Sequence, residues 1–176
     1  MAGEVGITIG EEDYVGANRV WFLHYLRRRK VLVRYALLLA SLAAALAMLE
    51  WSGGGGAAGI LRVVAFAIVG GGAGLLLCNG IGYVLLPRRA RRLFRQNPSF
   101  YKSYHYHWSD DGLAYRSERE SGMRPWKDFY RWSDGSEALL LMLNEQLFYI
   151  IPRRALTDAQ AEDLRATLGA HGPPRF

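Results

Sequence analysis

The stretch VLVRYALLLASLAAALAML at residues 31–49, followed closely by ILRVVAFAIVGGGAGLLLCNGIGYVLL at residues 60–86, decides the fold of this 176-residue chain. About 20 apolar residues in a helix cross the roughly 30 Å hydrocarbon core of a bilayer. Each stretch contains one charged residue, Arg34 or Arg62, close enough to an end for its side chain to reach the headgroups. Both stretches therefore have the length and composition of membrane-spanning helices.

The two stretches predict a hairpin of transmembrane helices, residues 31–51 and 60–86, joined by an external loop, residues 52–59. Pro87 cannot donate a helical hydrogen bond, so we expect the second helix to end there. A buried hairpin in the core of a soluble protein is the competing interpretation. We disfavour it because both runs are longer than a small core needs.

Basic residues flank both stretches, whereas the connecting segment, residues 50–59, has one acidic residue and no basic one. Short loops rich in arginine and lysine stay in the cytoplasm. We therefore expect a multi-pass protein of the cytoplasmic membrane with both termini in the cytoplasm. Each basic side chain near the surface also attracts anionic headgroups by about 1 kcal/mol. The residues predicted to contact anionic lipid are Arg27, Arg28, Arg29, Lys30, Arg88, Arg89, Arg91 and Arg92.

The charge of the chain is divided unevenly between its two parts. It carries 22 basic and 16 acidic residues, a net charge of +6. Residues 1–100 hold 12 basic and 5 acidic residues, whereas residues 101–176 hold 10 and 11. A nucleic-acid-binding domain needs a basic face, so we expect no nucleic-acid partner. The single cysteine, Cys78, excludes a disulfide within the chain.

Glycines are concentrated in the second stretch, where Gly70 and Gly74 have GxxxG spacing. Small residues let helices approach closely in lipid. We expect this surface to pack against the alanines of residues 43–47 in the first span, with homo-oligomerisation through Gly70 and Gly74 as the alternative. Asn79 is the strongly polar residue deep within the second span. No charged residue lies at the middle of either span, and this disfavours a transport pathway through the membrane.

The segments on either side of the hairpin predict a small α+β arrangement. Residues 1–30 contain a strand at residues 5–9 and then an amphipathic helix whose first turn is acidic. Residues 87–100 are expected to be a basic linker, and residues 171–176 a terminal tail.

Residues 101–170 predict a domain of short strands closed by one helix. Alternating or apolar runs between turn residues predict strands at 104–109, 113–118, 123–132, 138–143 and 147–151. Thr157 and Gln160 have the spacing of a capping box, which predicts a helix that begins there and ends near Leu168.

Two pairs of residues in this domain are candidates for binding. His105 and His107 are two apart on a predicted strand, so they face the same way and form a weak candidate for a metal site. Arg153 and Arg154 follow the last strand and have the chemistry to meet a headgroup phosphate or a partner's carboxylate. We favour an ion pair with Glu162 or Asp163 of the final helix instead.

Three parts of the chain resemble the YcxB-like membrane proteins of bacteria. They are the N-terminal ITIGEEDYVGANRVWFLHYLRRR, the two closely spaced apolar stretches, and the ending WKDFYRWSDGSEALLLMLNEQLFYIIPRRALTDAQAEDLRATL. The resemblance implies a PH-like cytoplasmic domain, in which a bent antiparallel sheet is closed by a C-terminal helix and the N-terminal strand adds to that sheet. The glycine-rich second stretch departs from the family. The family implies no established activity, so no catalytic residue is carried over.

The residues themselves also favour a binding function over an enzymatic one. No nucleophile, base and acid can be ordered into a catalytic set, and no phosphate-binding loop is present. We expect no cofactor. The sequence predicts a membrane-anchored interaction module that binds a protein or an anionic lipid at the inner face of the bacterial cytoplasmic membrane. The alternative is an oligomeric accessory subunit of a transport or channel assembly, joined through the glycine-rich span.

Overall fold

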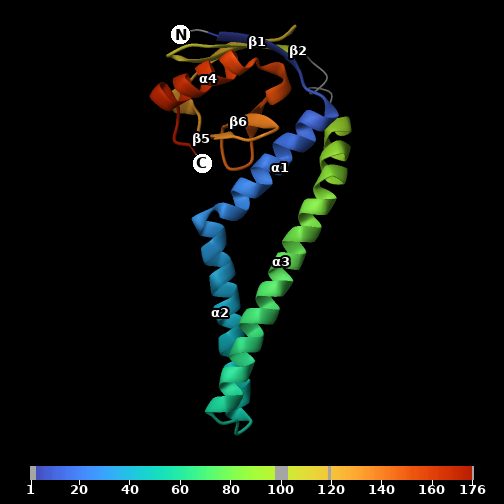
Figure 1. The fold of residues 1–176 in the computed structure, drawn as a ribbon, viewed down its shortest axis with the longest axis vertical. Helices are drawn as coiled ribbons and strands as arrows, with labels where there is room; N and C mark the ends of the chain where they lie inside the picture. Colours follow the sequence, from blue (N-terminus) through green and yellow to red (C-terminus); the bar gives the residue numbers. More distant parts are fainter. Residues whose placement is uncertain (1–2, 98–102, 119, 176) are drawn as a thin grey trace. The chain divides into compact units, whose positions relative to one another are not determined.

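The computed structural model describes residues 3–97, 103–118 and 120–175, and it contains two long apolar helices and two antiparallel sheets (Figure 1). The chain divides into two compact units. The sheet unit contains the residues up to Phe22 and those from Leu86 onward, and the hairpin unit contains Leu23–Leu85. This is an α+β protein with both long helices largely in the hairpin unit, and the two units are described in turn.

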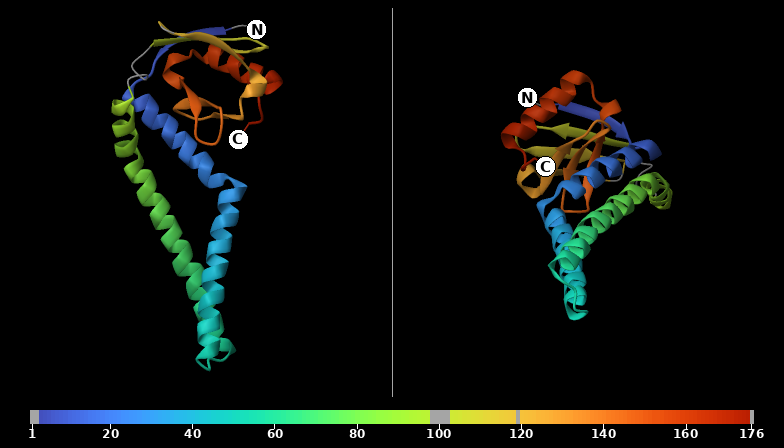
Figure 2. Two further views of the ribbon diagram at one scale, coloured as in Figure 1. Left: turned by 180° about the vertical axis from the view of Figure 1, so that it is seen from behind. Right: turned by 60° about the horizontal axis from the view of Figure 1, so that its bottom comes forward.

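The sheet unit has one four-stranded and one three-stranded antiparallel sheet, together with helix α4 (Figure 2). The strand order is β1-β2-β3-β4 in the first sheet and β5-β6-β7 in the second. The strands are β1 Gly3–Thr8, β2 Ser103–Trp108, β3 Gly112–Arg116, β4 Ser121–Pro125, β5 Arg131–Asp134, β6 Ala138–Met142 and β7 Phe148–Pro152. The helical elements are α1 Glu11–Arg27, η2 Trp126–Asp128, η3 Arg153–Ala155 and α4 Asp158–His171.

The N-terminal strand joins the sheet of the C-terminal domain. Strand β1 pairs antiparallel with β2, so that Val5 lies opposite Tyr106 and Ile7 opposite Tyr104. Both Val5 and Ile7 are buried, whereas Glu4, Gly6 and Thr8, which alternate with them, are exposed. The alternation places one apolar face of β1 on the core, which fixes its register in the sheet.

The prediction of one strand over residues 123–132 is wrong, because β4 ends at Pro125. Proline has no N–H for a continued ladder, and the chain turns through η2 before β5 begins. The Trp126 indole is buried and donates a 2.9 Å hydrogen bond to the carbonyl of Ser109, which stabilises the turn. The break separates β4 from β5 and gives two sheets where the sequence predicted one bent sheet.

A single hydrophobic core joins the two sheets, α1, α4 and the end of α3. Strand β6 is buried at all five positions, which requires cover on both of its faces. Leu164 and Leu168 of α4 are buried in the same core. The predicted capping box of α4 is confirmed, since the side chains of Thr157 and Gln160 each bond the other's backbone N–H.

The prediction that the second apolar helix ends at Pro87 is also wrong. Helix α3 is continuous over Ala57–Gln96 with Pro87 inside it, so most of the expected linker is helical. A proline in a helix interior costs about 3 kcal/mol. Ala90 and Phe94 beyond it are buried in the core of the sheet unit, and their burial offsets that cost. Asn97 follows the helix, and residues 98–100 of the expected linker lie outside the described residues.

The hairpin unit consists of the end of α1, helix α2 Arg29–Ser52 and α3 as far as Leu85. Both long helices have the length and apolar composition needed to cross a membrane, and only 6% of the apolar window of each is buried. The competing interpretation, a buried core hairpin, does not fit that exposure. A polar contact joins the helices, because the Tyr35 hydroxyl donates a hydrogen bond to Asn79 Oδ1 at 3.1 Å.

Candidate functional site

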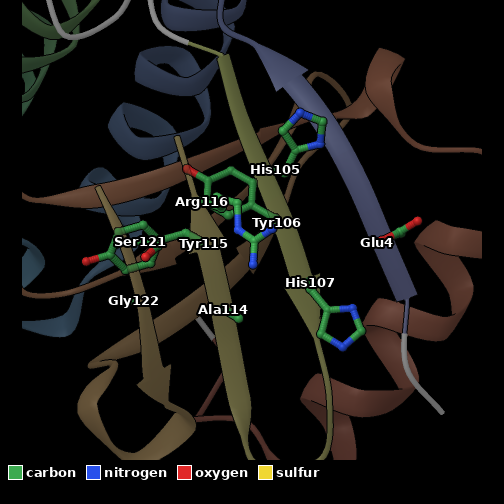
Figure 3. Close-up of a pocket in the computed structure, with 9 residues that line it drawn as sticks. All are labelled: Glu4, His105, Tyr106, His107, Ala114, Tyr115, Arg116, Ser121 and Gly122. Atoms are coloured by element: carbon green, nitrogen blue, oxygen red, sulfur yellow. The ribbon is translucent and has the colours of Figure 1, made fainter. Parts of the chain in front are cut away.

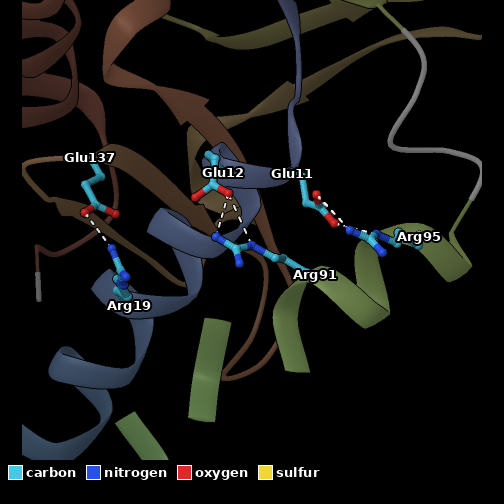
Figure 4. A network of polar contacts seen from close by, with 6 residues as sticks. All are labelled: Glu11, Glu12, Arg19, Arg91, Arg95 and Glu137. Carbon is cyan, nitrogen blue, oxygen red and sulfur yellow. Dashed lines mark hydrogen bonds and ion pairs between the residues drawn. The ribbon is translucent and has the colours of Figure 1, made fainter. Parts of the chain in front are cut away.

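The basic cluster at the end of α3 is the best-defined charged feature of the sheet unit (Figure 4). Arg91 binds Glu12 at 2.8 Å and Arg95 binds Glu11 at 2.7 Å, so α3 is held against the first turn of α1. The hydrogen bond from Arg95 lowers the pKa of Glu11 below its usual value. Arg91, one of the predicted lipid contacts, is therefore engaged within the chain.

Three other arginines of this cluster differ from Arg91 and Arg95. Arg88, Arg89 and Arg92 are exposed, and no partner for them is found among the described residues. Arg88 and Arg92 each precede a paired arginine by three residues and so share a side of α3 with it, whereas Arg89 points to another side. The structure thus separates a basic run that looks uniform in sequence into a paired set and an unpaired set.

The basic run before α2 belongs to the hairpin unit and is divided in a similar way. Arg27 and Arg29 are exposed, without a partner in the part of the chain that the structure describes. Arg28 lies over the ring of Tyr25, 5.8 Å from its centroid, and it occupies the break between α1 and α2. Lys30 is also exposed, but it does interact with another residue and is not counted as unpaired.

Arg153 and Arg154 do not pair with Glu162 or Asp163, so that prediction is wrong. Arg154 binds Asp13 at the start of α1, with a shortest distance of 2.5 Å, and it also donates to the carbonyl of Thr8 at 3.0 Å. Arg153 lies 3.7 Å from Asp134, which also binds Arg165 of α4 at 2.6 Å. The hydrogen bond that Arg154 donates to Asp13 raises the pKa of Arg154 above its usual value. Both arginines thus connect elements within the domain.

His105 and His107 lie on the same exposed face of β2, as their spacing predicts (Figure 3). They line an open hollow of about 700 Å³ on the outer side of the four-stranded sheet, which also includes Glu4 and Arg116. The described residues contain no group of three or more histidine, cysteine, aspartate or glutamate side chains that could hold a metal ion. The described residues therefore provide no third ligand for a metal site at His105 and His107.

The glycines of α3 make little contact within the hairpin unit. A side chain at Gly71 would meet Leu39 and Leu42 of α2, whereas one at Gly74 would meet nothing within 4 Å among the described residues. A side chain at Gly70 would meet only Phe66 of its own helix. The expected packing of Gly70 and Gly74 on the alanines of residues 43–47 is not found, and their surface stays open.

Sequence reasoning missed a group of tyrosines on the inner side of the same sheet. Tyr104 and Tyr106 alternate with the histidines on β2 and so face the opposite way, toward the core. There they meet Tyr115 of β3 and Tyr149 of β7, from the other sheet. The alternation in β2 placed two of these tyrosines on one face, but nothing local to the sequence paired β2 with β7.

Comparisons with curated proteins and with solved structures gave no match for this chain. The comparison with protein families matched a segment that runs from the end of β2 through most of α4. Residues 108–168 match the family described as YcxB-like protein, and the resemblance predicted from the sequence is confirmed for this segment.

Proposed function

We propose that this chain is a membrane-anchored interaction module. Helix α2 and the apolar part of α3 span the bacterial cytoplasmic membrane, and the sheet unit is a PH-like domain at its inner face. The domain binds an anionic lipid or a protein there. The fold supports the PH-like assignment through its antiparallel strands, which end in a single C-terminal helix, α4.

The observation that carries this proposal is the unpaired set Arg88, Arg89 and Arg92 at the end of the apolar part of α3. A guanidinium engaged with a carboxylate has little left to offer a lipid phosphate, whereas an unpaired one binds phosphate with two N–H groups. Arg91 and Arg95 serve the fold, so the unpaired three are the residues left to meet headgroups.

The orientation is tested by labelling single cysteines in cells. Cys78 is first changed to alanine, and then Ser52→Cys at the loop and Lys127→Cys in the sheet unit are made separately. A membrane-impermeant maleimide should label Ser52→Cys in intact cells and Lys127→Cys only after permeabilisation. The reverse pattern of labelling contradicts the proposed orientation. If neither variant is labelled, in intact or in permeabilised cells, the proposal is also contradicted.

The lipid contact is tested by native mass spectrometry of the full chain released from an uncharged detergent with added lipid. We expect the wild type to retain phosphatidylglycerol in preference to phosphatidylcholine, and Arg88→Gln/Arg89→Gln to lose most of that preference. The control Arg116→Gln/Lys127→Gln removes the same charge from exposed positions far along the chain and should keep it. An equal loss in both variants would show a general charge effect and contradict a lipid site.

Oligomerisation through α3 is the second candidate function, and the open surface at Gly74 favours it. Small residues that no part of their own hairpin covers are suited to close packing against another helix in lipid. We expect Gly74→Leu to reduce the oligomer measured by light scattering in detergent. Gly80→Leu, also in open space but outside the GxxxG pair and on another side of α3, should leave it unchanged. A wild-type chain that is monomeric in detergent and in nanodiscs contradicts this candidate.

A further inference from the structure

The tyrosines between the two sheets line a pocket of about 220 Å³. The pocket is smaller than the roughly 300–1,000 Å³ of sites that hold drug-sized ligands. Its walls come from β2 and β3 of one sheet and β7 of the other, with Glu120 at its edge. Its aromatic lining residues are Tyr104, Tyr106, Tyr115, Phe148 and Tyr149. A pocket of this size suits a small ligand or one end of a longer one.

The aromatic rings meet at several angles rather than in one stack. Tyr104 and Tyr106 are parallel with centroids 6.1 Å apart, and Tyr149 meets Tyr106 edge-on at 6.2 Å. Tyr115 lies 6.1 Å from Tyr149 at an intermediate tilt. Rings that differ in orientation around one space can present more than one negative π face to it. This arrangement resembles the aromatic cages that recognise quaternary ammonium groups.

The charges at the pocket favour a cation. Glu120 provides a carboxylate at the edge and accepts a 3.1 Å hydrogen bond from the Tyr104 hydroxyl. No basic side chain is found among the described residues that line the pocket. Burial raises the pKa of Tyr106, and burial followed by the Glu120 hydrogen bond raises that of Tyr104, so both hydroxyls stay neutral at physiological pH.

Tyr106 can add a hydrogen bond to these contacts. Its side chain is only 2% exposed, and it lines the pocket. A tyrosine hydroxyl can both donate and accept a hydrogen bond. A hydroxyl on the occupant of the pocket, or a water bound with it, can therefore bond the Tyr106 hydroxyl.

We propose that this pocket binds a small organic cation of the alkylammonium class, held by the tyrosine rings and by the charge of Glu120. The cation lies among the ring faces, and a hydroxyl on the ligand or a bound water meets the Tyr106 hydroxyl. The Glu120 carboxylate and the negative ring faces would repel an anion. A bare metal ion would lack ligands, since Glu120 is the one carboxylate among the described residues that line the pocket. The proposal concerns the sheet unit alone and does not depend on membrane anchoring.

The first test compares two ligands of the same shape by isothermal titration calorimetry. The full chain is kept in dodecyl maltoside, because phosphocholine detergents themselves carry a quaternary ammonium group. Choline is titrated against 3,3-dimethylbutan-1-ol, which replaces the charged nitrogen by carbon. We expect choline to bind at least about tenfold more tightly, which is the order of a desolvated cation–π attraction. Equal affinities, or no binding of choline, would overturn the proposal.

The second test uses variants of the pocket. Tyr149→Leu keeps an apolar side chain but removes a π face, and we expect choline affinity to fall at least about tenfold. Tyr149→Phe keeps the ring and should retain most of the affinity, as should Tyr130→Leu, a tyrosine outside the pocket. Glu120→Gln should weaken choline and leave the neutral alcohol unchanged. Near-ultraviolet circular dichroism checks that each variant is folded.

A loss in Tyr149→Phe equal to that in Tyr149→Leu would overturn the role of the ring. Because the comparison of choline with its neutral analogue uses the wild-type chain, it decides the proposal even where Tyr149→Leu fails to fold. A negative result in the cysteine-labelling or lipid experiments does not affect the result for choline. The membrane-anchor proposal and the cation-pocket proposal can therefore be rejected independently.

Discussion

The two units of the chain differ in the exposure of their apolar side chains, which are buried in the sheet unit and largely exposed in the hairpin unit. In the sheet unit Leu141 is 0% exposed within a core shared by both sheets, whereas in the hairpin unit Leu76 is 77% exposed on α3. Burial of apolar area is worth about 25 cal/mol per Å² in water. The sheet unit obtains this stabilisation from its own residues. The hairpin unit exposes a contiguous apolar surface, which in a water-soluble monomer is a mark of an interface.

Truncating one leucine in each unit should produce the largest difference between them. Leu141→Ala creates a cavity in a closed core, and we expect it to lower the free energy of unfolding by about 2–5 kcal/mol. Leu76→Ala removes a side chain that contacts little of the chain, and we expect it to leave that free energy nearly unchanged. Denaturation in an uncharged detergent, followed by tryptophan fluorescence, measures both, because Trp108, Trp126 and Trp132 are buried in the sheet unit.

Leu141→Ala and Leu76→Ala serve as controls for each other, since the chemical change is the same in both variants. If Leu76→Ala destabilised the chain as much as Leu141→Ala, Leu76 would have to be covered by another part of the protein or by a second copy. The comparison of the two units would then be wrong, and oligomerisation through α3 would gain support.

The features predicted correctly are those with a local cause. The two apolar helices follow from the length of their apolar runs, and the capping box of α4 follows from Thr157 and Gln160 three residues apart. The common face of His105 and His107 follows from the two-residue period of a strand. Each of these depends on residues that are close together in the chain.

The features that were missed depend on residues far apart in the chain. Asp13 and Arg154 are separated by 141 positions, so their ion pair exists only because β1 joins the sheet and places α1 beside η3. The passage of α3 through Pro87 is similar, because the burial of Phe94 and the pairing of Arg91 with Glu12 come from outside the helix. The tyrosine pocket requires β2 and β7 of different sheets to meet.

A smaller effect is expected from the hydrogen bond between α2 and α3. Tyr35→Phe removes the hydroxyl that donates to Asn79, while the Asn79 amide keeps its 2.7 Å bond to the carbonyl of Leu75. Hydrogen bonds between helices in lipid average about 0.6 kcal/mol. We expect a loss of that order for the hairpin unit, measured by the lifetime of α2–α3 contact under force in a bilayer, and no change in the sheet unit. Ser41→Ala removes an exposed hydroxyl of α2 that has no partner among the described residues, and it provides the control. A loss of several kcal/mol would mean that this bond organises the hairpin.

The smallest effect is expected at the exposed ion pair of Glu11 with Arg95. The hydrogen bond from Arg95 lowers the folded pKa of Glu11 below its ordinary value of 4.5, while the unfolded chain keeps a value near 4.5. A lowered folded pKa contributes stability that is fully present above the unfolded value and is lost as the pH falls through the folded one. Glu11→Gln should therefore lower stability slightly at pH 7 and have a smaller effect at pH 3.

Thermal unfolding of the sheet unit at the two pH values measures this difference, and high salt should shrink it, because exposed pairs are screened. Glu118→Gln removes one carboxylate from an exposed position and measures the general effect of that charge. A Glu11→Gln effect that is equal at both pH values would show that the side chain acts through packing. In that case the first turn of α1 is held to the end of α3 by Phe94 and Tyr14, whose rings lie 6.0 Å apart, and not by charge.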